Sequence, residues 1–108
     1  MSGEADKTAN PVRGEAQIHV GGRAYLLRPS FDALVRAEEE LGPLFALVER
    51  AGAGQLRLTE ITALFWHCLA PPSAVSREQI GDAVIASGLA SATKPLKVLL
   101  TQILKGRG

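Results

Sequence analysis

The clearest pattern in the chain is an alternation of apolar and polar residues near the N-terminus, followed by apolar residues at helical spacing. In residues 14–20 every second residue is apolar, which is typical of a strand with one buried face. The pair Gly21-Gly22 supplies the positive φ angles of a two-residue hairpin turn, and residues 23–28 form a second strand. Because an isolated hairpin is marginally stable in water, we expect helices to cover one of its faces.

The next segment predicts two short helices with clear start and stop signals. Ser30 is suited to cap the first helix, and Gly42 is suited to end it. Pro43 fits the first turn of a second helix, which reaches about Ala51. The apolar residues expected on the buried faces are Phe31, Leu34, Val35 and Leu41 in the first helix, and Leu44, Leu47 and Val48 in the second.

Three further helices are predicted from capping signals and apolar spacing. Thr59 is expected to cap the third helix, and Pro71-Pro72 ends it. The fourth helix starts at a capping box in residues 76–79 and fades at Gly88, and the last helix follows Thr93. The expected apolar stripes are Ile61, Leu64, Phe65, Cys68 and Leu69 in the third helix, and Leu96, Leu99, Leu100, Ile103 and Leu104 in the last.

Together these elements predict an α+β fold, with an N-terminal β-hairpin packed on a small bundle of four to five short helices. The 108 residues are enough for a single domain, which we place at residues 14–106. Residues 1–13 are polar and lack periodicity, so we expect a disordered N-terminal tail. Two short strands alone leave unpaired backbone on both outer edges, which predicts strand addition by a partner or another copy.

The composition is that of a globular protein, with 46% hydrophobic and 21% charged residues. A formal net charge of +1 gives no overall indication of binding to nucleic acid or to an anionic membrane. The single cysteine, Cys68, excludes an internal disulfide and fits a reducing compartment. No apolar segment reaches the ~20 residues needed to span a bilayer, and the N-terminus lacks a signal peptide's apolar stretch. We expect a soluble, intracellular protein without membrane contact.

The residues capable of catalysis or metal binding are few and scattered. His19, His67 and Cys68 are the only soft metal ligands, and adjacent residues on a helix point to different sides. The run of acids in residues 38–40 is expected to form a solvated helix face, with Glu38 at the edge of a contact. We therefore expect no enzyme activity, no cofactor and no metal.

The candidate partner-binding residues are Trp66, Glu38, Lys94, Lys97 and Lys105. The chain has no acid after Asp82, so the last helix carries only positive charges. One explanation of these lysines is their favourable interaction with the dipole at the helix C-terminus. The other is a charged surface that steers a charged partner or stacks copies head to tail. Trp66 lies away from the centre of its stripe, so it either closes the core or anchors a partner.

Four segments carry a resemblance to a known family. The chain resembles the small tail proteins of gene transfer agents and related siphophages over residues 14–106. The segments are Gly21-Gly22-Arg23-Ala24-Tyr25-Leu26-Leu27-Arg28, then Phe31-Asp32-Ala33-Leu34 with Glu38-Glu39-Glu40-Leu41-Gly42, then residues 58–69, and Ser76-Arg77-Glu78-Gln79-Ile80-Gly81 with the closing Leu104-Lys105-Gly106. Members of this family resemble tail assembly chaperones and are also described as tail tube proteins.

The resemblance implies a non-enzymatic tail assembly factor, a chaperone that binds the tape-measure protein or other tail subunits in the bacterial cytoplasm. The alternative is a structural tail component of the particle, and self-association is compatible with both.

A third hypothesis is a small helix-turn-helix-like DNA-binding protein, since a short break joins the third and fourth helices. Arg57 and Arg77 there are balanced by Glu60, Glu78 and Asp82, which argues against a surface that approaches phosphates.

Overall fold

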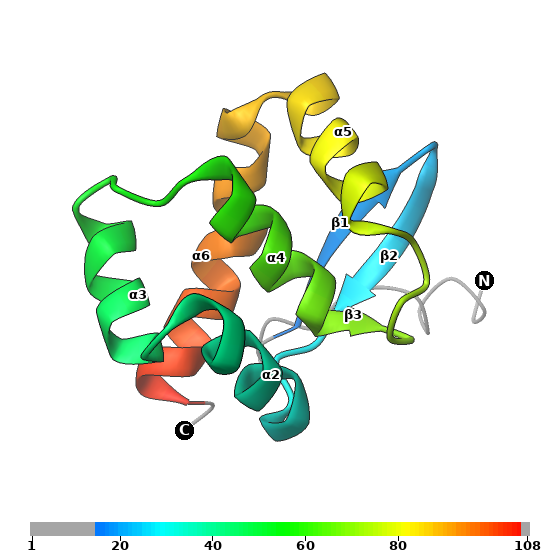
Figure 1. Cartoon of the computed structure of the whole chain (residues 1–108). Helices are drawn as coiled ribbons and strands as arrows, with labels where there is room; N and C mark the ends of the chain where they lie inside the picture. Colours follow the sequence, from blue (N-terminus) through cyan, green and yellow to red (C-terminus); the bar gives the residue numbers. More distant parts are fainter. Residues whose placement is uncertain (1–14, 107–108) are drawn as a thin grey trace.

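The computed structural model describes residues 15–106, so the predicted tail at residues 1–13 lies outside the described residues. Within that range it contains a small antiparallel sheet and five helices (Figure 1). This arrangement confirms the predicted α+β fold with a hairpin packed on helices. The elements are β1 (Ala16–Val20), β2 (Arg23–Leu27), α2 (Phe31–Leu41), α3 (Leu44–Gly52), α4 (Leu58–Cys68), β3 (Leu69–Ala70), α5 (Arg77–Ser87) and α6 (Leu89–Lys105).

The hairpin forms as the alternating pattern predicts. Strands β1 and β2 pair antiparallel, with Val20 opposite Arg23 and Ala16 opposite Leu27. Both turn glycines have positive φ angles, of 60° and 83°, which side chains with a Cβ rarely adopt. Alternate residues of β1 are buried, and α5 and α6 pack against this strand. The hairpin consequently lies along one side of the helical bundle (Figure 1).

A third strand follows α4 directly, where the sequence pattern predicts one more helical residue. Leu69 pairs with Leu27, and Ala70 pairs with Leu26, on the far side of β2 from β1. The residue before a proline is disfavoured in helical conformation, so Ala70 must become extended ahead of Pro71. The expectation that both hairpin edges are unpaired is therefore wrong for this part of β2.

The core lies where α4 meets the other elements. Leu64, Phe65 and Cys68 of α4 are fully buried, as their predicted stripe requires, and Ile61 is half-buried. Helix α4 packs between α2 and α5, and its buried stripe belongs to one cluster with the inner face of the sheet (Figure 1). The other fully buried large side chains are Leu27, Leu47, Ile80 and Leu99.

Helix α2 buries a face that only partly matches the predicted one: Leu34 and Leu41 pack against the core, as predicted, while the other two predicted residues do not. Its buried residues are Ala33 and Ala37, whereas Phe31 is 85% exposed and Val35 is also exposed. Residues four positions apart share one face of a helix, and two alanines allow the α2 backbone to approach α4 closely. The predicted burial of Phe31 and Val35 is wrong because this small-residue face packs inward, which turns the opposite face to solvent.

Most helix boundaries follow the predicted caps. The Ser30 hydroxyl accepts a hydrogen bond from the Ala33 N–H at 3.1 Å, and the Ser76–Gln79 capping box forms in both directions. Helix α4, however, begins at Leu58 and not after Thr59, because the Glu60 carboxylate accepts the Arg57 N–H at 2.9 Å. This contact caps the first turn at Arg57, two residues before the predicted cap at Thr59.

Helix α6 also begins earlier than predicted. It starts at Leu89, directly after Gly88, whose φ of 89° redirects the chain between α5 and α6. The first turn closes through a hydrogen bond from the Ser91 N–H to the Gly88 carbonyl at 3.0 Å. Pro95 therefore lies inside the helix instead of in its first turn, at the cost of one backbone hydrogen bond.

Candidate protein-binding surfaces

The described residues include neither a cluster of metal ligands nor an exposed cysteine. Among residues 15–106, no three His, Cys, Asp or Glu side chains are placed to hold a metal ion. Cys68 is 1% exposed, and burial raises the pKa of its thiol to about 12. The thiol therefore lacks the thiolate character of a nucleophile at neutral pH. No helix in the described part of the chain is long and apolar enough to cross a membrane.

A polar cluster joins α2, α4 and α5. The Arg77 guanidinium donates two hydrogen bonds of 2.6 Å to the two carboxylate oxygens of Glu40. The His67 Nε2 lies 2.8 Å from one of those oxygens. The hydrogen bonds from Arg77 and then from His67 lower the pKa of Glu40 from 4.5 to about 2. These contacts tie three helices together through one ionised carboxylate.

Glu40 is exposed, as expected for the acidic run, with 38% of its side-chain surface accessible. Because it lies three residues after Ala37, it also reaches the side of α2 that meets α4. His67, its partner in α4, is buried. Its Nδ1 is buried without a hydrogen-bond partner in the described structure, so a proton on Nε2, donated to Glu40, satisfies the ring best.

Trp66 is half-buried beside this cluster. Its indole N–H donates to the Val75 carbonyl at 3.1 Å, and the Arg77 guanidinium lies over the ring, 4.5 Å from its centroid. Both contacts are within the chain, so they favour packing over partner binding for this side chain. Its role as an anchor for a partner stays a prediction.

Glu38 lies at the connection between α2 and α3. Its carboxylate accepts a hydrogen bond from the Leu44 N–H at 3.1 Å, and the side chain is otherwise exposed. An acid at a helix N-terminus also interacts favourably with the helix dipole, so this contact stabilises the start of α3. A role in partner binding stays a prediction for Glu38 too.

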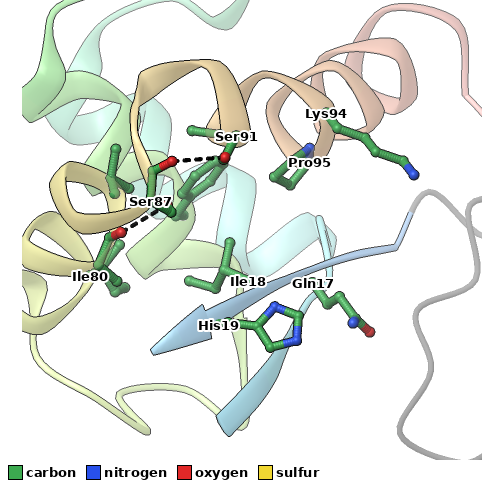
Figure 2. A pocket seen from close by; sticks show the side chains of 12 residues that line it. Gln17, Ile18, His19, Ile80, Ser87, Ser91, Lys94 and Pro95 are labelled. Carbon is green, nitrogen blue, oxygen red and sulfur yellow. Dashed lines mark hydrogen bonds between the residues drawn. The ribbon is translucent and has the colours of Figure 1, made fainter. Parts of the chain in front are cut away.

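A cavity of about 350 Å³ lies between β1, α5 and α6 (Figure 2). Its floor is apolar, and Gln17, His19 and Lys94 lie on one side of it. On another side, Ser87 and Ser91 donate hydrogen bonds of 2.9 and 2.8 Å to backbone carbonyls one turn earlier. These hydroxyls already have partners, which leaves Lys94 as the charged group of the rim.

An apolar groove of about 320 Å³ separates α3 from α6, and we call it the α3–α6 groove. Lys97 and Lys105 lie along it, and neither forms an ion pair within residues 15–106. The apolar residues that line it are Val48, Ala51, Leu96, Leu100 and Leu104. An open apolar surface edged by charges is typical of a surface that contacts other proteins.

The comparisons with known proteins identify the family. Residues 13–106 match the family model described as "Phage tail tube protein, GTA-gp10". The chain belongs to this phage tail protein family. No curated protein and no solved structure is significantly similar to it. The match confirms the resemblance to tail proteins of gene transfer agents and phages, and it covers the hairpin and every helix described above.

The geometry separates the candidate residues of this tail protein into three groups. Lys97 and Lys105 lie together at the α3–α6 groove, and Lys94 lies at the other cavity. Trp66 and Glu38 have partners within the chain. The exposed face of α2 is not evident from the sequence, because Phe31 and Val35 have the spacing of a buried stripe. The signal that could have found it is the second stripe formed by Ala33 and Ala37.

Proposed function

We propose that this protein is a non-enzymatic structural component of a phage-like tail, assembled in the bacterial cytoplasm and retained in the particle. The observation that carries the proposal is the family match, which spans nearly the whole chain and describes a tail tube protein. Support also comes from the α3–α6 groove, which offers other tail subunits an apolar surface edged by Lys97 and Lys105, two lysines without an ion pair among residues 15–106.

The test is the composition of finished particles. Particles are purified from producing cells, and this chain is quantified by mass spectrometry relative to other tail proteins. We expect it in a fixed ratio to the other tail subunits. Absence from finished particles, together with co-purification with the tape-measure protein from cell extracts, would contradict the structural role.

That opposite outcome is the result expected of a second candidate function, a tail assembly chaperone for the tape-measure protein. The observation that favours it is the small sheet, whose strands have five, five and two residues in the described structure. A tube wall built from continuous sheet is expected to contain more strand than the described residues form. Transient contacts through exposed helix faces suit an assembly factor, because they bury little surface and are readily released.

The DNA-binding hypothesis has less support than either role. A helix that enters the major groove must present positive charge to the phosphates. In α5, Arg77 is held by Glu40, while Glu78 and Asp82 are exposed. We expect no salt-dependent gel shift on duplex DNA.

A further inference from the structure

We propose that the α3–α6 groove of one copy of this chain binds the exposed face of α2 in a second copy, so that copies associate head to tail. Two surfaces carry the proposal, and each lacks a covering element in the described structure. The inference concerns the isolated chain and does not rest on the proposed role in tails, so either can fail without the other.

The first surface is the outer face of α2. Phe31 and Val35 lie four positions apart and are both exposed. Glu38 and Glu39 lie three and four positions after Val35, so acids border this apolar stripe. Asp32 also lies beside the stripe, but it pairs with Arg36. Because Glu38 accepts the Leu44 N–H, Glu39 is the acid without a hydrogen-bond or ion-pair partner among the described residues. A phenylalanine with 85% of its surface exposed loses hydrophobic stabilisation that contact with another apolar surface would recover.

The second surface is the α3–α6 groove. Its centre is apolar, with Leu104 at one end exposing 51% of its surface, and its edge carries Lys97 and Lys105. No acidic residue lies in α6, and none lines the groove. A bound helix with acidic borders would therefore meet attractive charge, and a bound helix with basic borders would be repelled.

The match between these surfaces identifies a second copy as the occupant. An apolar stripe with acidic borders on α2 complements an apolar groove with basic edges between α3 and α6. Because the two surfaces differ, the contact is heterologous: one copy keeps a free α2 face, and the other keeps a free groove. Head-to-tail contacts of this kind extend into rings or filaments, which is the geometry of a repeating assembly.

The first test compares substitutions at two exposed apolar residues. Phe31→Ser removes the larger and more exposed side chain of the stripe. Ile85→Ser on α5 is the matched control, since Ile85 is 61% exposed and outside both surfaces. Sedimentation velocity over a range of concentrations measures self-association. We expect concentration-dependent association of the wild type and the control, and a dissociation constant raised at least about tenfold by Phe31→Ser.

The second test uses opposite charge reversals. Lys97→Glu places an acid in the groove, and Glu39→Lys places a base beside the stripe. Each variant alone is expected to be monomeric, because its groove and its α2 face then repel. In an equimolar mixture every groove finds a complementary face on the other variant. Association is therefore expected to return in the mixture, which also shows that both variants are folded.

Three outcomes would overturn the proposal. One is a wild type that stays monomeric at the highest soluble concentration. Another is a Phe31→Ser variant that associates as strongly as Ile85→Ser. The third is a mixture of the two charge variants that remains monomeric. Binding of an acidic amphipathic helical peptide to the groove of a monomeric wild type would assign the groove to a different protein.

Discussion

Replacement of Glu40 by alanine tests whether the polar cluster between α2, α4 and α5 stabilises the fold. The substitution removes the carboxylate that accepts hydrogen bonds from Arg77 and contacts His67. Glu39→Ala is the matched control, because Glu39 is its exposed neighbour in the same helix. Both variants exchange a helical glutamate for alanine, so the change in helix propensity is the same.

The magnitude follows from the exposure of the partners. The ion pair with Arg77 is 38–41% exposed at the two side chains, so solvent screening limits its contribution to at most about 1 kcal/mol. His67 is buried, and loss of the acceptor for its Nε2 costs a further ~1–2 kcal/mol. We therefore expect Glu40→Ala to lower the free energy of unfolding by about 2 kcal/mol. For a domain of roughly 100 residues this lowers Tm by about 8 °C.

The effect is also expected to depend on pH. The pKa of Glu40 is lowered from 4.5 to about 2 in the folded protein, so its ionised form stabilises the fold fully above pH 4.5. That contribution is lost as the pH falls from 4.5 through 2. The difference in stability between wild type and Glu40→Ala therefore shrinks over this range.

The assay is urea unfolding followed by circular dichroism at several pH values, with dilute protein to keep it monomeric. At pH 7 we expect Glu39→Ala within about 0.5 kcal/mol of wild type. The reasoning is refuted if Glu40→Ala is as stable as Glu39→Ala. It is also refuted if the difference in free energy of unfolding between wild type and Glu40→Ala stays constant between pH 5 and pH 2, because the carboxylate charge would then contribute nothing to stability.

Three further predictions concern the interior and the helix connections. With its pKa of about 12, Cys68 should resist Ellman's reagent in the folded protein and react in guanidinium; equal rates would contradict its burial. Leu99→Ala should lower the free energy of unfolding, measured by thermal unfolding, by about 3 kcal/mol, because Leu99 is fully buried. Leu104→Ala on the same helix should lower it by less than about 1 kcal/mol, because Leu104 is exposed. Gly88→Ala should lower the free energy of unfolding by about 1–2 kcal/mol, since the φ angle of Gly88 is 89°. Gly81→Ala should raise it by up to about 1 kcal/mol, because the added methyl group meets only a threonine side chain at 3.8 Å. A Gly88→Ala variant that is more stable than wild type would refute the strain at Gly88.

The local signals in the sequence predict the elements well because they act within a few residues. Gly21-Gly22 fixes the hairpin turn, and Ser30 and the Ser76–Gln79 capping box form the expected hydrogen bonds. The errors arise where two local signals compete. At the start of α4 the carboxylate of Glu60 displaces the expected Thr59 cap, and at α6 the positive φ of Gly88 starts the helix before Pro95.

The candidate surfaces depend less on local signals, because they require two elements to meet. Lys97 and Lys105 are recognisable from sequence as cations on a helix without acids. The groove beside them forms only because Val48 and Ala51 of α3 lie against α6. Glu40 likewise looks like part of a solvated acidic run until α2 packs on α4 and brings it to His67 and Arg77.

The sequence by itself determines the α+β class, the hairpin and the helices, because alternation, caps and glycines act through neighbouring backbone atoms. Only the tertiary structure decides which face of each helix is buried. In α2 both a stripe with Phe31 and a stripe with Ala33 have the period of a buried face. The close approach of α2 to α4 selects the alanines and exposes the phenylalanine, and such a choice depends on the shape of a partner that lies far along the chain.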